Sequence, residues 1–354
     1  MTLKKTSDRL ILCAVDLSPA SPLVVAWALA LAQRTETRLC LFHAVHTPSD
    51  ALHPSAEFER GGDLRQRRQN CREQMAGLMR GEQTPWQSEI VFGEPVEEML
   101  RFCRNNDVWL IVAGCRSLKG LQRLLLGDVI ERLARSAALP LFMVRDIKTT
   151  GQKIGRIGIC CGPERESRAM VDLGSKLAGL FQSEIVLLHA MESAVRPLPD
   201  ELPTMPYSVS QERLQDRLKS RLLDQLPAQV RALVPCRAHV AGGTARDLLP
   251  GLAAEAGLDV AVVGVRHHSI VGKLVLGSAT EALLRKAPCH VLTVPVSPVG
   301  SEAARSAPPA AGRTGVVRDP LFLDHRCPSG HLESHGRLEE GIAHHAGPPC
   351  GGWC

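Results

Sequence analysis

The chain has 354 residues, of which 44% are apolar and 22% charged, a composition typical of a globular protein with two domains of about 100–200 residues each. Its apolar runs have the length of strands, far below the ~18–20 residues of a membrane span, and Met1–Arg9 is not followed by the apolar core of a signal peptide. We therefore expect a cytoplasmic protein with no membrane association. The net charge of +5 is dispersed and only 3% of residues are aromatic, so nothing indicates a nucleic-acid partner.

The first half of the chain alternates apolar runs with amphipathic or polar stretches, which is the pattern of alternating strands and helices. Strands are predicted at Leu10–Val15, Arg38–Val45, Gln87–Phe92, Val108–Ala113 and Leu139–Val144. Helices are predicted between them, at about Pro22–Gln33, Ala56–Met79, from Gly93-Glu94-Pro95 to Asn105, and at Asp128–Ser136.

The second half repeats this order, which indicates an internal duplication. Strands are predicted at Ile157–Cys161, Glu184–Ala190, Cys236–Ala241, Asp259–Val263 and Cys289–Val294, and helices at Ser167–Leu180, Ser210–Gln225, Thr244–Ala256 and Ser278–Lys286. Strands that are apolar on both faces and alternate with helices favour parallel sheets covered on both sides. We therefore predict two tandem α/β domains, each a doubly wound five-stranded parallel sheet, with ligands at the carboxyl ends of the strands.

The predicted domain boundaries follow changes in composition. The first domain spans residues 1–147, a short polar linker lies at about Asp146–Lys153, and the second domain spans 153–297. Residues 298–354 are rich in Gly, Pro, Ala and His and predict a disordered tail. The histidines and cysteines of this tail match no zinc-binding spacing, so no metal site is predicted. The twelve cysteines of the chain contain no CxxC pair, and we expect reduced thiols rather than disulfides.

Two loops carry the most specific signal. Gly114-Cys115-Arg116-Ser117 is followed after nine residues by Gly127-Asp128, and Gly264-Val265-Arg266-His267 is followed after nine residues by Gly277-Ser278. A glycine after a buried strand lets a ligand approach the backbone, and the free N–H groups at a helix start attract phosphate. The alternative is that these glycines only end strands and begin helices.

The chain resembles the tandem two-domain form of the universal stress protein family over nearly all of Arg9–Val296. The resemblance rests on AVDLSPAS with Asp16 and Ser18, on second strands ending in His-Ala, on the two glycine loops, and on the closing phrases GDVIERLARSAALPLFMV and GSATEALLRKAPCHVLTVP. In this family the last strands of two domains pair, which here implies an intramolecular pseudo-dimer that joins Leu139–Val144 to His290–Val294.

Members of the family that bind ATP carry Gly-x2-Gly-x9-Gly-Ser/Thr and a first-strand aspartate. The resemblance therefore implies two candidate adenine-nucleotide sites. The first comprises Asp16, Ala44, Gly114 and Gly127, and the second comprises Ala190, Val263, Gly264, Gly277 and Ser278. The first departs from the pattern at Ser117 and Asp128. The second departs at His267, and it has Gly162 in place of the aspartate.

These departures favour the second site for ATP. A carboxylate at Asp128, expected there as a helix N-cap, would cost a nearby phosphate about 1–4 kcal/mol unless Mg²⁺ bridges the two. Gly162 lacks an adenosine anchor that is worth about 1–3 kcal/mol. His43 and His189 are expected to be hydrogen-bonded strand residues rather than bases, and no catalytic residues are predicted. We expect a stress-response protein that acts by binding; the alternatives are a weakly ATP-hydrolysing switch and an interaction scaffold that binds no nucleotide.

Overall fold

The structure is a computed structural model that describes residues 9–45, 57–115, 127–146, 151–163, 167–191, 207–267 and 274–296. The predicted tail at 298–354 lies outside these residues, as do Ser117 and the side chain of His267.

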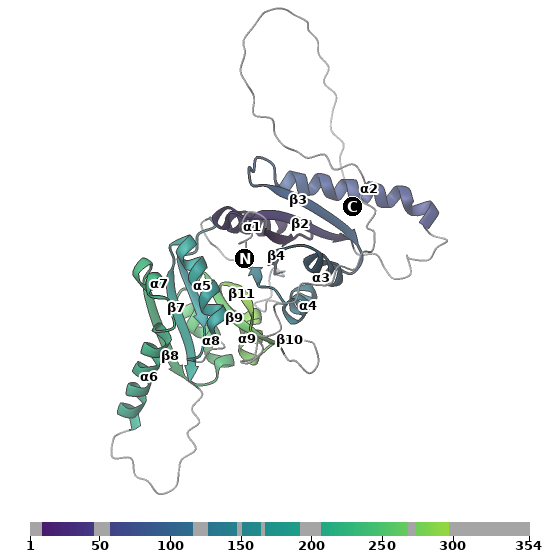
Figure 1. The fold of residues 1–354 in the computed structure, drawn as a ribbon. Coiled ribbons are helices and arrows are strands. Elements are labelled where there is room, and N and C mark those ends of the chain that lie inside the picture. The colour runs from purple at the N-terminus through teal and green to yellow at the C-terminus, as the bar shows by residue number, and fades with distance from the viewer. Residues whose placement is uncertain are drawn as a thin grey trace, which may run out of the picture. The chain divides into compact units, whose positions relative to one another are not determined.

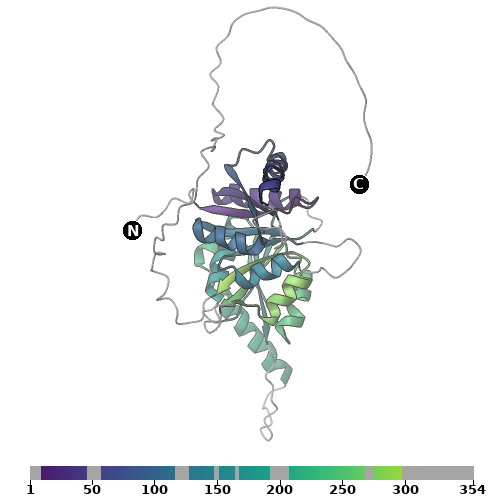
Figure 2. The same ribbon diagram turned by 90° about the vertical axis from the view of Figure 1, so that its right-hand side faces the viewer.

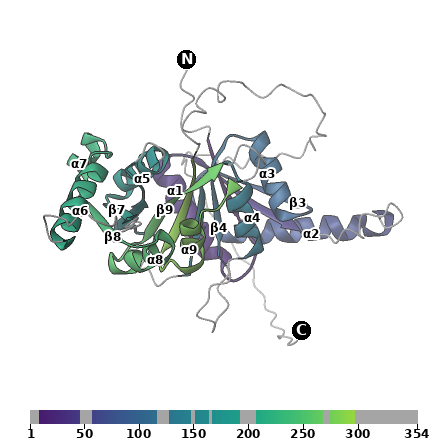
Figure 3. The same cartoon turned by 90° about the horizontal axis from the view of Figure 1, so that it is seen from below.

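The first repeat alternates strands and helices as expected (Figure 1). Its strands are β1 (Leu10–Ala14), β2 (Arg38–Val45), β3 (Trp86–Phe92), β4 (Val108–Gly114) and β5 (Leu141–Val144). Its helices are α1 (Ser21–Thr35), α2 (Glu57–Leu78), α3 (Pro95–Asn105) and α4 (Asp128–Ser136). The long helix α2 extends past β3 at the edge of the sheet (Figure 3).

The second repeat follows the same order with two additions. Its strands are β6 (Arg156–Cys160), β7 (Glu184–Met191), β8 (Cys236–Gly242), β9 (Val260–His267), β10 (Leu274–Val275) and β11 (His290–Val296). Its helices are α5 (Arg168–Phe181), α6 (Tyr207–Leu223), α7 (Ala228–Leu233), α8 (Ala245–Glu255) and α9 (Ser278–Lys286). The short helix α7 and the two-residue strand β10 are the elements absent from the prediction.

Both repeats share one sheet, ordered β3-β2-β1-β4-β5-β11-β9-β6-β7-β8, with β10 paired to β9. Within each repeat the five main strands are parallel, as predicted. The expected pairing of the last strands is also present: β5 and β11 run antiparallel, with Met143 opposite Val291. Figure 2 shows the purple-to-blue first repeat and the teal-to-yellow second repeat meeting along this sheet.

Helices cover both faces of the sheet, and each face has its own hydrophobic cluster. Side chains of α1, α2, α5 and α6 pack on one face, where Trp27 and Leu31 are fully buried. Side chains of α3, α4, α8 and α9 pack on the other, around Leu133 and Leu283. Aliphatic residues fill most of both clusters, as expected from the scarcity of aromatic residues.

The seam between the repeats contains a buried charge. Arg145 directly follows β5, and its Nη2 donates hydrogen bonds to the carbonyl oxygens of Leu283 (3.2 Å) and Leu284 (2.5 Å) in α9. Cations at a helix C-terminus satisfy carbonyls that have no partner within the helix. Arg285 of α9 also forms an ion pair of 3.0 Å with Glu131 of α4, which links the two repeats.

One predicted strand boundary is wrong. The sequence predicted that β9 ends at Val263 and that a loop begins at Gly264, but β9 continues to His267. Its extension pairs with β11, with Gly264 opposite Val294 and Arg266 opposite Val296, and then with β10. The backbone pairing supplied by the longer β11 outweighs the weak strand propensity of glycine.

Candidate functional site

A cavity of about 440 Å³ lies in the first repeat, at the carboxyl ends of β1, β2 and β4. The beginnings of α1, α3 and α4 complete its walls. Its size falls within the range typical of small-molecule sites, and doubly wound sheets bind ligands at this edge. The four predicted first-site residues, Asp16, Ala44, Gly114 and Gly127, all line this cavity.

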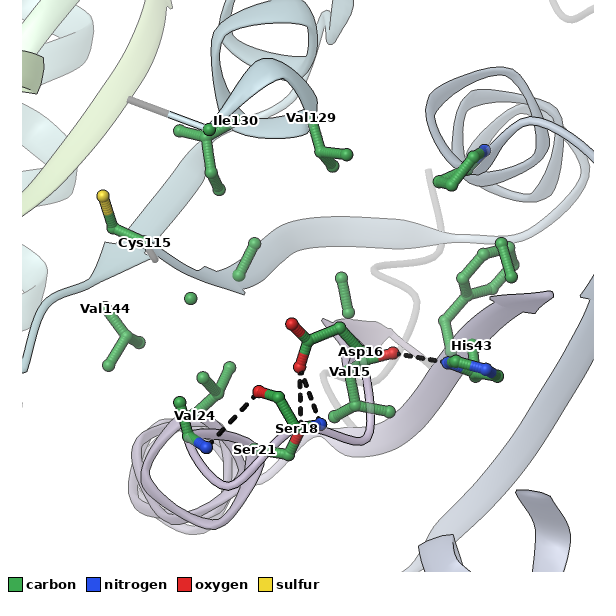
Figure 4. Close-up of a pocket in the computed structure, with 18 of the residues that line it drawn as sticks. Val15, Asp16, Ser18, Ser21, Val24, His43, Cys115, Val129, Ile130 and Val144 are labelled. Carbon is green, nitrogen blue, oxygen red and sulfur yellow. Dashed lines mark hydrogen bonds between the residues drawn. The ribbon is translucent and has the colours of Figure 1, made fainter. Parts of the chain in front are cut away.

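Asp16 follows β1 and is held by the turn that leads into α1. The backbone N–H of Ser18 and the hydroxyl of Ser21 both donate to its Oδ1, at 3.0 and 3.1 Å (Figure 4). Leu17, which lies between Asp16 and Ser18, adopts a left-handed backbone conformation with φ of 56°. A non-glycine residue in this region costs about 1 kcal/mol or more, so the surrounding contacts fix the turn. The Asp16 carboxylate is thereby oriented at the cavity.

His43 and Ala44 bring the end of β2 to the same cavity. The His43 Nδ1 donates to the carbonyl of Val15 at 2.8 Å, which joins the ends of β1 and β2 (Figure 4). The second repeat makes the same bond, from His189 Nδ1 to the carbonyl of Cys161 at 3.0 Å. Both histidines are therefore hydrogen-bonded strand residues, as the sequence predicted.

The two glycines of the first site differ in their surroundings. At Gly114 a Cβ atom would lie 2.6 Å from Cγ2 of Val24, so α1 can pack here only against a glycine. At Gly127, the N-cap of α4, a Cβ would meet nothing within 4 Å among the described residues. The start of α4 lines the cavity through Gly127 and Asp128.

Asp128 does not cap α4, which corrects the sequence prediction. Gly127 occupies the N-cap position and, as a glycine, has no side chain that could cap the helix, so Asp128 is the first helical residue. Its carboxylate is 83% exposed and lies 3.8 Å from Nη1 of Arg132. Arg132 is bound more closely by Glu94, at 2.6 and 3.1 Å. Glu94 in turn caps α3 by accepting the N–H of Glu97.

The cavity is acidic. Asp16, Asp128 and Asp146 line it, and within the described ranges its lining includes neither lysine nor arginine. Sequence reasoning missed Asp146, which follows β5, and the buried thiol of Cys115, which follows β4. Their positions after strand ends were the signal that could have found them. Burial raises the pKa of the Cys115 thiol, which keeps it protonated.

In the second repeat, the backbone at the predicted site is engaged by neighbouring side chains. Gly162 stands where the first repeat has Asp16, and its carbonyl accepts hydrogen bonds from Ser167 and from Gln225. Thr280 donates to the carbonyl of Gly264 at 2.8 Å. A Cβ on Gly264 would lie 3.0 Å from Sδ of Met170.

The other predicted second-site residues lie at the same edge of the sheet. Ala190 is in β7 and Val263 in β9, opposite Thr293 of β11. Gly277 is the N-cap of α9 and Ser278 its first residue. Nucleotide binding at either site stays a prediction.

The fold is a duplicated α/β architecture with a cavity at the carboxyl edge of its sheet, and comparison with known proteins identifies its class. A family model described as the universal stress protein family matches residues 9–145 and 153–295. The chain therefore belongs to the universal stress protein family and carries its domain twice. The described residues include no helix that is long and apolar enough to cross a membrane.

Individual relatives match parts of the chain. Universal stress protein YxiE of Bacillus subtilis (strain 168) is 34% identical over 61 residues, which are 17% of this chain and 41% of YxiE. The matched stretch thus spans less than half of that relative. Universal stress protein A homolog 1 of Coxiella burnetii (strain RSA 493) is 28% identical over 129 residues, which are 36% of this chain and 87% of the relative.

Solved structures show the same fold over both repeats. A putative universal stress protein from Pseudomonas aeruginosa UCBPP-PA14 has a TM-score of 0.55 and 18% identity, and the match covers 82% of this chain and 94% of that one. A universal stress protein from Archaeoglobus fulgidus DSM 4304 has a TM-score of 0.57 and 13% identity, with 81% and 98% covered.

Proposed function

We propose that the chain is a cytoplasmic stress-response protein that binds an adenine nucleotide as its Mg²⁺ complex, in the first-repeat cavity. The observation that carries this proposal is the oriented Asp16 carboxylate in a 440 Å³ cavity at the carboxyl edge of the sheet. This choice departs from the sequence prediction, which favoured the second repeat.

The adenosine part of the nucleotide would contact Asp16 and the strand ends. Carboxylates accept hydrogen bonds from ribose hydroxyls, and a hydrogen bond to a charged group contributes about 1.5–3 kcal/mol. Ala44 and Gly114 leave space beside this carboxylate because their side chains are small or absent. The second repeat has no carboxylate at the corresponding Gly162.

The phosphates would lie toward the open start of α4. Gly127 has no side chain to cap the N–H groups that follow it, and the positive end of the nine-residue helix favours anions. Asp128 opposes them, because it places a negative charge at the same helix start. Carboxylate oxygen is also a preferred ligand of Mg²⁺, so Asp128 fits a role in holding the cation between itself and the phosphates.

We propose binding without efficient hydrolysis. His43, the imidazole in the cavity wall, uses Nδ1 to join two strands, and its counterpart His189 does the same in the second repeat. A duplicated structural bond favours a structural role over that of a base. A phosphate-release assay tests this view: turnover above the uncatalysed rate that is lost in His43→Asn would instead support the weak ATPase.

Calorimetric titration with Mg·ATP tests the binding proposal. We expect saturable binding that weakens about 10- to 100-fold in Asp16→Asn, from loss of the charged acceptor. Asp172→Asn, which changes an exposed carboxylate of α5, is the matched control and should bind as the wild type does. Loss of binding in Ser278→Asp with retention in Asp16→Asn would assign the nucleotide to the second repeat. Absence of binding at millimolar Mg·ATP would leave the scaffold alternative.

A further inference from the structure

A second cavity, of about 550 Å³, lies at the opposite edge of the sheet from the first. It is lined by Arg9, which precedes β1, by the end of α1 and by Trp109 of β4. The second repeat completes it with one side of α5, from Leu173 to Leu180. Both repeats are therefore needed to form this cavity, unlike the first, whose lining residues all come from the first repeat.

Trp109 is placed in this cavity by an irregularity of the sheet. Leu10 of β1 pairs with Val108, but the next residue, Ile11, pairs with Leu110, so Trp109 is the extra residue of a bulge. The bulge turns Trp109 toward the same hydrophobic cluster as Leu110. Bulges of this kind re-aim a side chain and are often found near binding sites.

The second repeat lacks this feature. There Ile157 pairs with Val260 and Gly158 with Ala261, in regular register. The residue that corresponds to Trp109 is Asp259, whose carboxylate accepts the backbone N–H groups of Gly155 and Arg156. The pseudo-symmetry of the fold therefore does not require Trp109, and its indole Nε1 is buried without a hydrogen-bond partner in the described structure.

The cavity is cationic. Arg9, Arg34 and Lys176 line it, against a single carboxylate from Glu36. The Arg9 guanidinium lies over the Trp109 ring at 5.7 Å, and that of Arg34 lies over the Phe181 ring of α5 at 4.3 Å. Among the residues that the structure describes, none of these three cations takes part in an ion pair.

Apolar side chains form another part of the wall. Leu173, Leu177 and Leu180 face it from α5, and Leu180 is 41% exposed, which makes it one of the few large apolar side chains open to solvent in the described structure. A cavity that combines an apolar wall with cations that form no ion pair within the described residues is complementary to an anion with an apolar body.

We propose that this second cavity, between the repeats, binds an organic acid with an apolar body. The carboxylate of the ligand lies among Arg9, Arg34 and Lys176, and its apolar part lies against Trp109 and the leucines of α5. The site is separate from the proposed nucleotide site, because the two cavities share no lining residue.

Titration of the full chain with decanoate and with 1-naphthoate tests the proposal, and the two probes distinguish an aliphatic from an aromatic body. The readout is the indole N–H resonance of Trp109, assigned by its loss in Trp109→Phe. We expect a saturable shift with at least one probe, and at least tenfold weaker binding of the uncharged analogue, decanol or methyl 1-naphthoate.

Variants locate the anion. Arg34→Gln and Lys176→Gln should each weaken binding about 3- to 10-fold, since each removes one of several cations near the carboxylate. The matched control is Arg38→Gln. Arg38 is exposed and follows Thr37 of the cavity lining, but it does not line the cavity itself, so this variant should bind the probe as the wild type does. Saturating Mg·ATP should not compete. No shift of the Trp109 resonance at millimolar probe, equal binding of the uncharged analogue, or equal loss in Arg38→Gln would overturn the proposal.

Discussion

The backbone N–H of Arg145 donates a 3.0 Å hydrogen bond to Nδ1 of His290, which joins two residues at the seam of the repeats. Because Nδ1 accepts here, the imidazole is neutral. Its ring packs edge-on against Trp27, with centroids 4.5 Å apart, and beside Phe142 at 5.6 Å. His290 Nε2 is buried without a partner in the described structure. Burial, together with the nearby Arg145 charge, lowers the pKa of His290 to about 4.

This relationship predicts acid sensitivity. The unfolded chain binds a proton at His290 below a pKa of about 6.5, whereas the folded chain does so only near 4, so stability falls as the pH is lowered between these values. The contribution of this residue is on the order of 3 kcal/mol. Urea unfolding at pH 7.0 and pH 4.5 measures it. His290→Asn retains an acceptor for Arg145, and it should show a smaller difference between the two pH values; an equal difference would contradict the assignment.

Gly114 is predicted to be intolerant of a side chain for reasons of packing. Gly114→Ala would place Cβ at 2.6 Å from Val24, and overpacking of this kind typically costs about 1–3 kcal/mol. Thermal unfolding should show the loss. Gly251→Ala is the matched control, because Gly251 lies inside α8 with open space at its Cβ position, and alanine there should stabilise by about 0.5–1 kcal/mol. Two variants of equal stability would show that α1 can move away from β4.

The sequence predicts this fold well because its strands are continuous apolar runs between amphipathic helices. The pairing of β5 with β11 followed from the family resemblance. The extension of β9 past Gly264 could not be predicted, because its pairing with β11 depends on Val294 and Val296, which are distant in the sequence. The bulge at Trp109 could not be predicted either, since a one-residue register shift leaves the apolar pattern of β4 unchanged.

The candidate site was predictable in its residues and less so in its geometry. Gly114 and Gly127 were singled out by spacing and Asp16 by the family resemblance, and the cavity brings them together. The position of Asp128 in α4 was not predicted correctly. The N-cap and the first helical position differ by one residue, which is within the usual uncertainty of a helix boundary. The hydrogen bonds that engage Gly162 also depend on Gln225, which is distant in sequence.

Asp128→Ser should strengthen nucleotide binding. Removal of a carboxylate near the phosphates is worth about 1–4 kcal/mol without Mg²⁺, so affinity for free ATP should rise about 5-fold or more. With Mg²⁺ present the gain should be smaller, since the variant also loses an oxygen ligand for the cation. Calorimetry in EDTA and in excess Mg²⁺ separates the two cases. A weaker affinity for free ATP in this variant would contradict the placement of the phosphates at α4.

The thiols of the native protein should differ in reactivity. Burial raises the pKa of Cys40 and of Cys161 to about 12, so neither forms the thiolate that reacts with alkylating agents at pH 8. Cys71 of α2 is only half-buried, and burial raises its pKa less. Iodoacetamide should therefore label Cys71 well before the other two, as peptide mass spectrometry can show. Equal labelling rates would indicate that the sheet opens on the timescale of the reaction.

The most direct test of the central claim is hydrogen–deuterium exchange of the wild-type chain with and without Mg·ATP. Binding in the first-repeat cavity predicts slower exchange in peptides that contain Asp16–Val24 and Gly127–Arg132, and unchanged exchange in the equivalent peptides around Gly162 and Gly277. Protection confined to the second-repeat peptides, or no protection at millimolar Mg·ATP, would contradict the claim.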